Sequence, residues 1–201
     1  MGLIETPRQS LKEKQWKLRE DTILDAASEL VFTKGYNAMT MDDVSNLVGI
    51  SKATLYQHFA SKHDLLVSVA CRTSDRAFEN MSSVSNLENP RERAEALIDR
   101  IVADRFGSDS PPFIEAVGEL TEILSADHPY AQKERRNIEF VAGVLEDVKK
   151  AKAMPHSLSI PVAVHVLMSA LRSTDLLKSI TDGTLSQAEV SASLKQMVLG
   201  A

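Results

Sequence analysis

A glycine between two short amphipathic patterns, Gly49, constrains the fold more than any other feature of the sequence. Before it, Thr40 and Asp43 have the spacing of a capping box, in which the side chain of each bonds the backbone N–H of the other. After it, Ser51 is a residue type that favours the position before a helix. Gly49 can adopt positive φ without a clash, which ends one helix and turns the chain. Residues 40–62 therefore predict a helix-turn-helix arrangement.

The two short helices of this motif should each bury one face. In both, apolar residues recur at the three- and four-residue spacing of a single helix face. The side chains expected inside are Val44, Leu47, Val48, Leu55 and Phe59. A preceding helix, from about Gln15 to Lys34, offers a matching apolar stripe and stops at Gly35. Three helices around one small core are the result.

The outer face of the second short helix carries small or polar residues and no acid: Ala53, Thr54 and Gln57. Such a face suits the DNA major groove, which admits one helix and offers donors and acceptors to short polar side chains. Other residues flank this face, where phosphates would lie. The predicted DNA-binding residues are Thr40, Ser51, Lys52, Ala53, Thr54, Tyr56, Gln57, His58 and Lys62. The alternative is a solvated face in an ordinary three-helix packing, since short motifs also arise by chance.

A longer run of residues resembles the N-terminal domain of the tetracycline-repressor (TetR) family. It comprises Gly35-Tyr36, Thr40, Val44, Gly49-Ile50-Ser51-Lys52-Ala53-Thr54-Leu55-Tyr56-Gln57-His58-Phe59 and Ser61-Lys62, together with the preceding helix from Ile23 to Leu30. The match covers about residues 17–68. The sequence departs from the family pattern at Val31, Ser45, Val48 and Ala53, and the methyl group of Ala53 limits how closely that helix approaches DNA. The resemblance implies a transcriptional regulator, most simply a repressor released by a small molecule.

Composition and charge agree with an all-α protein of two domains. With 8 Gly, 7 Pro and few alternating β-branched runs in 201 residues, the chain should be mostly helical. We expect a helix-turn-helix domain over residues 1–64, which begins with a flexible basic arm over about residues 1–15, and a larger helical domain over residues 65–201. Residues 1–62 hold eight basic and eight acidic residues, so the net charge of −5 resides in residues 63–201. A basic surface on the first domain is therefore still possible.

Two apolar helices near the end of the chain predict self-association. Residues 160–180 read as one helix that is apolar over most of its circumference, and such a helix must bury more than one face. A last helix begins at Ser186 and carries an apolar stripe that includes Met197. Exposing both would leave large apolar patches, which predicts a homodimer. The resemblance implies the same pairing, through the last two long helices.

The larger domain offers candidate ligand-binding residues. His165, Ser169 and Arg172 fall on one stripe of the apolar segment, where they could anchor a ligand or bond one another at a dimer seam. Aromatic and sulfur-containing side chains could line a pocket, although such residues at helical spacing are more often plain core. These candidates are Phe106, Phe113, Tyr130, Phe140 and Met154.

Motifs for enzymatic chemistry and cofactor binding are missing. The sequence contains no phosphate-binding glycine loop, dinucleotide fingerprint or metal-binding histidine pair. We therefore expect a non-enzymatic protein without metal or cofactor. Its single cysteine, Cys71, fits a reducing cytoplasmic location, and no apolar run is long enough to span a membrane. The expected partners are double-stranded operator DNA, a second copy of the chain and an unidentified small-molecule effector. Alternatives are a DNA-binding regulator controlled by a protein partner or by nothing, and an enzyme or carrier with a helical core.

Overall fold

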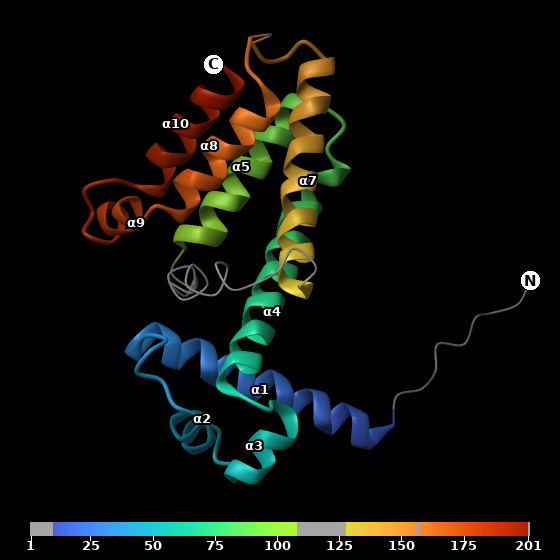
Figure 1. Cartoon of the computed structure of the whole chain (residues 1–201). Coiled ribbons are helices and arrows are strands. Elements are labelled where there is room, and N and C mark those ends of the chain that lie inside the picture. Colours follow the sequence, from blue (N-terminus) through green and yellow to red (C-terminus); the bar gives the residue numbers. More distant parts are fainter. Residues whose placement is uncertain (1–9, 108–127, 156, 201) are drawn as a thin grey trace, which may run out of the picture. The chain divides into compact units, whose positions relative to one another are not determined.

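The computed structural model describes residues 10–107, 128–155 and 157–200 (Figure 1). All regular structure in these residues is helical, which confirms the all-α expectation. The predicted N-terminal arm lies outside them up to residue 9. The helices are α1 (Leu11–Lys34), α2 (Met41–Val48), α3 (Lys52–His58), α4 (Lys62–Ser82), the 3-10 turn η1 (Ser83–Asn86), α5 (Pro90–Phe106), α7 (Pro129–Lys150), α8 (Ile160–Arg172), α9 (Thr174–Thr181) and α10 (Gln187–Leu199).

The chain divides into two compact units, Met1–Val69 and Ala70–Ala201, here called unit 1 and unit 2. The division falls within α4, as does the domain boundary predicted after residue 64. In unit 1, α2 packs on both α1 and α3, and the core takes its side chains from all of these helices and the start of α4. Its fully buried members include Ile23, Val44, Leu55 and Leu65.

Helix α1 begins earlier than expected from the sequence. Ser10 and Glu13 form a capping box, in which the Ser10 hydroxyl accepts from the Glu13 N–H at 3.3 Å and the Glu13 carboxylate accepts from the Ser10 N–H at 2.8 Å. This pair satisfies N–H groups that the first helical turn leaves without partners. The helix therefore extends to Leu11, while its end at Gly35, with φ 81°, is where the sequence placed it.

One side chain of α2, that of Leu47, is exposed although the sequence predicted it to be buried. Val44 is completely buried as expected, but Leu47 is 48% exposed. The inner stripe runs instead through Met41, Val44 and Ser45, with the Ser45 hydroxyl donating to the carbonyl of Asp42 at 3.0 Å. A serine that bonds its own helix in this way loses little by burial, since its one donor is satisfied.

Unit 2 is built around α5, which packs against both α7 and α10, while α8 packs on α7. Asn89 caps α5 by accepting from the N–H groups of Arg91 and Glu92. Arg91 ties three distant segments together: its Nη1 donates to the carbonyls of Ala153 at 2.8 Å and of Leu199 at 3.3 Å. The carbonyl ends of two segments, 62 and 108 residues away, are thus satisfied by one side chain at the start of α5.

The apolar segment over residues 160–180 is not the single helix predicted. It forms α8 and α9, with a bend of 53° between them. The Ser173 hydroxyl accepts from the N–H of Leu176 and caps α9, and Asp175 follows in the first turn of that helix. The bend lets one segment cover the core with two differently directed helices, since Leu176, Leu177 and Ile180 pack against that core.

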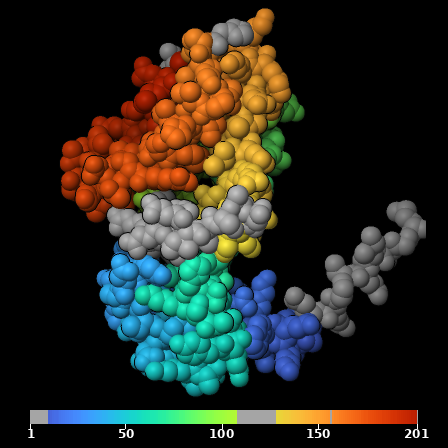
Figure 2. Space-filling view, viewed as in Figure 1, coloured from blue at the N-terminus to red at the C-terminus, as the bar shows by residue number. Residues whose placement is uncertain are grey.

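Helices α8 and α9 lie at the surface on the side seen in Figure 2. Within the described part of the chain, no helix taken alone is long and apolar enough to cross a membrane. The pair α8 and α9 reaches that length and composition only together, across the bend. Leu167 and Leu171 of α8 are buried among the side chains of unit 2.

Candidate nucleic-acid interface and ligand-binding residues

The turn between α2 and α3 has the caps that the sequence predicts. The Thr40 hydroxyl accepts from the Asp43 N–H at 3.1 Å, and the Asp43 carboxylate accepts from the Thr40 N–H at 2.9 Å. Lys34 donates to Asp43 at 2.8 Å, and these hydrogen bonds, that of Lys34 first, lower the pKa of Asp43 to about 2. Gly49 has φ 74° and ψ 34°, the left-handed conformation expected at a helix end, and Ser51 caps α3.

Helix α3 exposes one polar face and buries the other. Leu55 and Phe59 are buried in the core of unit 1, as predicted. Lys52, Ala53 and Gln57 are exposed, and so is half of Tyr56, at 50%. The face therefore presents an ammonium group, a primary amide and a phenol, which together can meet phosphates and base edges.

Thr54 is less available than its position on the helix implied. Its hydroxyl is joined to that of Ser51 by a hydrogen bond of 2.8 Å, and its backbone N–H donates to the same Ser51 oxygen at 3.1 Å. The side chain is half-buried. Both hydroxyls are therefore engaged in the helix cap, which leaves Gln57 as the uncommitted polar group at the centre of the face.

The two lysines of the predicted contact set are positioned by residues that sequence reasoning missed. Lys52 Nζ lies 2.6 Å from a carboxylate oxygen of Asp42, and both side chains are exposed. Lys62 Nζ lies 4.4 Å from the ring centroid of Tyr36 and donates to the carbonyl of Asn37 at 3.4 Å. A cation above an aromatic face is attracted by the ring quadrupole, so Tyr36 holds the ammonium group in place.

His58 does not lie with the exposed residues of α3. Its ring stacks on that of Trp16 in α1, with centroids 3.8 Å apart and planes inclined by 27°. Both ring nitrogens are buried and have no hydrogen-bond partner among the described residues. The structure therefore places His58 in a packing contact and not at the flank where the sequence expected a phosphate.

The structure describes all but one of the predicted ligand-binding residues of unit 2. Phe106 and Tyr130 are buried, and Met154 belongs to the core. Phe140 is half-buried and contacts Phe78 edge to face at 5.6 Å. Phe113 lies outside the described residues.

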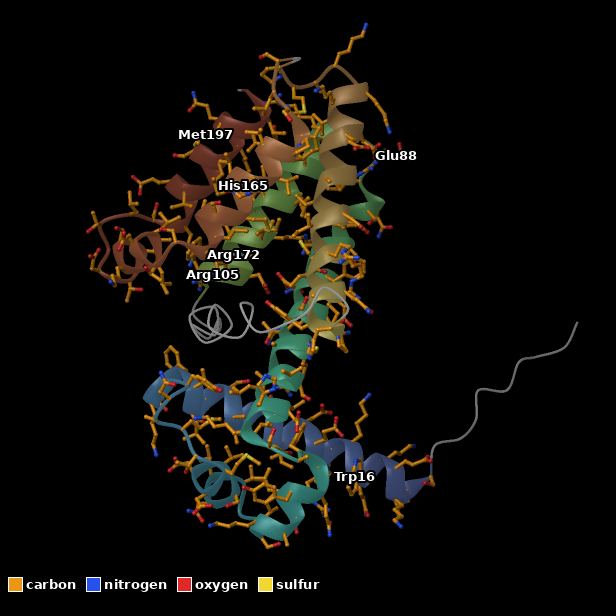
Figure 3. The ribbon with its side chains drawn as sticks, viewed as in Figure 1. Trp16, Glu88, Arg105, His165, Arg172 and Met197 are labelled. Carbon is orange, nitrogen blue, oxygen red and sulfur yellow. The ribbon has the colours of Figure 1, made fainter. Side chains whose placement is uncertain are left out.

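The polar stripe of α8 faces outward. His165, Ser169 and Arg172 are all exposed, and Arg172 lies 3.7 Å from Glu134 of α7 (Figure 3). Val162 on the same helix is 54% exposed, and Met197 of α10 is 62% exposed. An exposed apolar side chain therefore lies on each of these two helices.

Burial raises the pKa of Tyr130, and the negative charge of Glu134 raises it further.

A cluster of polar residues that are far apart in the sequence joins α4 to α7 and includes Glu134. Asn137 donates to the carbonyl and hydroxyl of Ser74, both at 3.0 Å, and the Ser74 hydroxyl donates to Glu134 at the same distance. Burial opposes the charge of Asp75, but hydrogen bonds from Lys133 and Arg136 lower its pKa below the usual value.

Comparison with known proteins identifies the first unit. Residues 23–69 match the family model described as bacterial regulatory proteins, tetR family. This part of the chain is similar to the N-terminal domain of tetR-family regulators. Its matched segment covers α2 and α3 completely, and with them the capped turn and the exposed polar face of α3.

The individual relatives include proteins whose names give opposite effects on transcription. FasR of Mycolicibacterium smegmatis, named a transcriptional activator, is 35% identical over 94 residues, which are 44% of this chain and 43% of FasR. IcaR of Staphylococcus aureus, named a negative transcriptional regulator, is 45% identical over 53 residues, or 26% of this chain and 28% of IcaR. The chain spans less than half the length of both relatives.

The fold of most of the chain has a parallel among solved structures. AibR, whose structure was determined with isovaleryl coenzyme A and operator DNA, superposes with a TM-score of 0.74 over 90% of this chain and 98% of its own. The sequence identity is 18%, so the likeness establishes the fold alone. Both units therefore have the helical architecture expected from the family resemblance.

Proposed function

We propose that this protein is a transcriptional regulator that binds operator DNA in the cytoplasm through α3 of unit 1, as a homodimer. The observation that carries the proposal is the outer face of α3, where Gln57 is exposed on the same short helix as Lys52 and Tyr56, and Ser51 caps the start of that helix. An amide can make two hydrogen bonds to adenine in the major groove, while cationic and phenolic groups meet phosphates. The tetR-family match covers this helix.

Two copies of the chain are needed for a specific site, because one seven-residue helix reads few bases. We assign the dimer interface to the outer faces of α8 and α10, where Val162 and Met197 are exposed. A two-fold dimer places its recognition helices in successive major grooves of a pseudo-palindromic site, about one helical turn apart.

Regulation would come from a small molecule bound by unit 2. Repression with release is the simplest form, because a ligand that prefers a conformation with mismatched recognition helices weakens DNA binding. Isovaleryl coenzyme A bound to AibR makes acyl-coenzyme A thioesters the first effector class to test. Reciprocity provides the control: the thioester must weaken operator binding and the operator must weaken thioester binding by the same factor.

The test of DNA binding is selection of duplexes from a random library, followed by affinity measurements at two salt concentrations. Gln57→Ala should alter the selected sequence and cost roughly 1–3 kcal/mol on the original site. Lys62→Ala should weaken all duplexes alike and reduce the salt dependence by about one unit per half-site.

Two results would contradict the proposal. The first is an unaltered selected motif in Gln57→Ala together with a changed one in Lys62→Ala, in proteins of unchanged helical content. The second is a wild-type protein that enriches no duplex, which would favour an enzyme or carrier with a helical core.

A further inference from the structure

The ring of Trp16 stacks on that of His58 and so joins the exposed first half of α1 to the end of α3. Residues 11–19 of α1 are exposed along their length, and the buried stripe of this helix starts only at Ile23. Trp16 is 42% exposed and lies on this outer half of α1 (Figure 3). His58 is the last residue of α3, so the ring contact connects the outer half of α1 to the C-terminal end of the helix that carries Gln57.

The other end of α3 is fixed by different means. Ser51 caps its N-terminus, and Leu55 anchors its middle in the core. At the C-terminus the chain leaves the helix at Phe59 in an extended conformation. A seven-residue helix frays readily, because its terminal groups lack intrahelical partners. The side-chain stack at His58 therefore adds a lateral restraint close to the residues that would meet base edges.

The environment of His58 favours the neutral imidazole. Its nitrogens are buried without a partner among the described residues, and a buried cation would lose more hydration than a buried neutral ring. Burial accordingly lowers the pKa of His58 below its usual value of 6.5. Two charged groups of α1 act on it in opposite directions: Glu20 favours the proton and Arg19 opposes it.

We propose that Trp16 is a positioning residue for DNA recognition, whose indole holds a neutral His58 and thereby fixes the C-terminal end of α3. This role rests on the proposed function, since it concerns the same DNA-binding surface. Trp16 itself need not touch a base. Its contribution is to reduce the conformational freedom that the recognition helix would otherwise lose on binding.

This role of Trp16 predicts that operator affinity falls on acidification, whereas a contact between His58 and a phosphate would predict a rise. The folded-state pKa of His58 is below the unfolded value, so the stacked arrangement is fully favoured above about pH 6.5 and loses stability as the pH falls below it. Operator affinity should therefore fall with His58 protonation. A histidine that contacts phosphate would instead bind DNA more tightly when protonated, because the new charge faces an anion.

The stack can be tested first without DNA, since Trp16 is the only tryptophan in the chain. We expect Trp16 fluorescence at about pH 7.5 to differ between wild type and His58→Gln, because the replacement removes the stacked ring. Acidification of wild type should produce an emission change below about pH 6.5 that His58→Gln lacks. Leu18→Ala alters another exposed side chain of the same half-helix and should behave as wild type. Identical emission in wild type and His58→Gln, or a His58-dependent change above about pH 6.5, would overturn the proposal.

The second arm uses a duplex selected from a random library by the wild-type protein. Trp16→Ala should weaken its binding roughly two- to tenfold per half-site at about pH 7.5, Trp16→Phe should restore most of the affinity, and Leu18→Ala should leave it unchanged. Between about pH 7.5 and 5.5 wild type should lose affinity more steeply than Trp16→Ala. Unchanged affinity in a folded Trp16→Ala, or a His58-dependent gain of affinity on acidification, would overturn the positioning role. Selection of no duplex would overturn the proposed function and this role with it, while the fluorescence arm would still establish whether the rings stack.

Discussion

The exposed helix faces of the two units differ in how their side chains are held. On unit 1, Lys52 is placed by Asp42, Lys62 by Tyr36 and His58 by Trp16, so the surroundings of α3 are ordered before any partner arrives. On unit 2, the outward residues Val162 and Met197 offer apolar area. The first arrangement suits a partner recognised by direction and charge. The second suits a partner recognised by the area it buries.

The largest expected effect comes from charging the unit 2 face. Val162→Glu combined with Met197→Glu should give a folded monomer, because both side chains are exposed within one protomer. Loss of the second recognition helix should reduce operator affinity roughly 10²- to 10⁴-fold. Sedimentation and duplex titration measure the two results. Leu87→Glu is the matched control, since Leu87 is also exposed and adjoins Glu88, away from α8 and α10 (Figure 3). A stable wild-type monomer at micromolar concentration would remove the basis for assigning this face to a dimer.

Two adjacent residues of α3, Leu55 and Tyr56, allow the buried face and the exposed face of this helix to be tested separately. Leu55 is completely buried and Tyr56 is half exposed. Leu55→Ala should lower the free energy of unfolding by about 2–5 kcal/mol, through lost burial and the cavity that remains. Tyr56→Ala should change that free energy by less than about 0.5 kcal/mol while weakening DNA binding. Denaturant unfolding and duplex titration of both variants provide the comparison, and equal destabilisation by the two would show that the face of Tyr56 also supports the fold.

The smallest expected effect is the loss, at low pH, of the stability that the Asp43 carboxylate gives to the start of α2. The pKa of Asp43 is about 2 in the folded protein, below its ordinary 3.8. Its carboxylate therefore contributes stability that is fully present above pH 3.8 and is lost as the pH falls toward 2. We expect the difference in unfolding free energy between wild type and Asp43→Asn to shrink between about pH 4 and pH 2. A difference that stays constant over this interval would mean that Asp43 acts on α2 through its hydrogen-bonding shape and not through its charge.

Local signals in the sequence were sufficient for the turn of unit 1. Thr40, Gly49 and Ser51 act on groups within three or four residues of themselves, so their spacing alone predicts which backbone N–H groups they satisfy. The same holds for Asn89 at the start of α5. The burial of Leu55 and Phe59 also followed from periodicity, because a short amphipathic helix has only one apolar face to bury.

Contacts between elements were not predictable in this way. The stack of His58 on Trp16 joins residues of two helices, and neither position carries a local signal for the other. The same holds for the edge-to-face contact of Phe140 in α7 with Phe78 in α4. Other errors were avoidable: Ser10 with Glu13, and Ser173 followed by Asp175, are capping signals that sequence reasoning overlooked. The second was hidden by the uniform apolarity of residues 160–180, which made one long helix the simpler interpretation.

The bonds of Arg91 bear on the order in which this protein can be completed during synthesis. Its partners include the carbonyl of Leu199, a buried residue 108 positions further along. A nascent chain that has emerged only as far as α8 can form the caps and core of unit 1, whose contacts are local. The core of unit 2 at the start of α5 must wait for α10, so α5 and α7 remain incompletely covered until the last part of the described chain has emerged. Of the two units, the second therefore presents apolar surface to other nascent chains and to chaperones for longer.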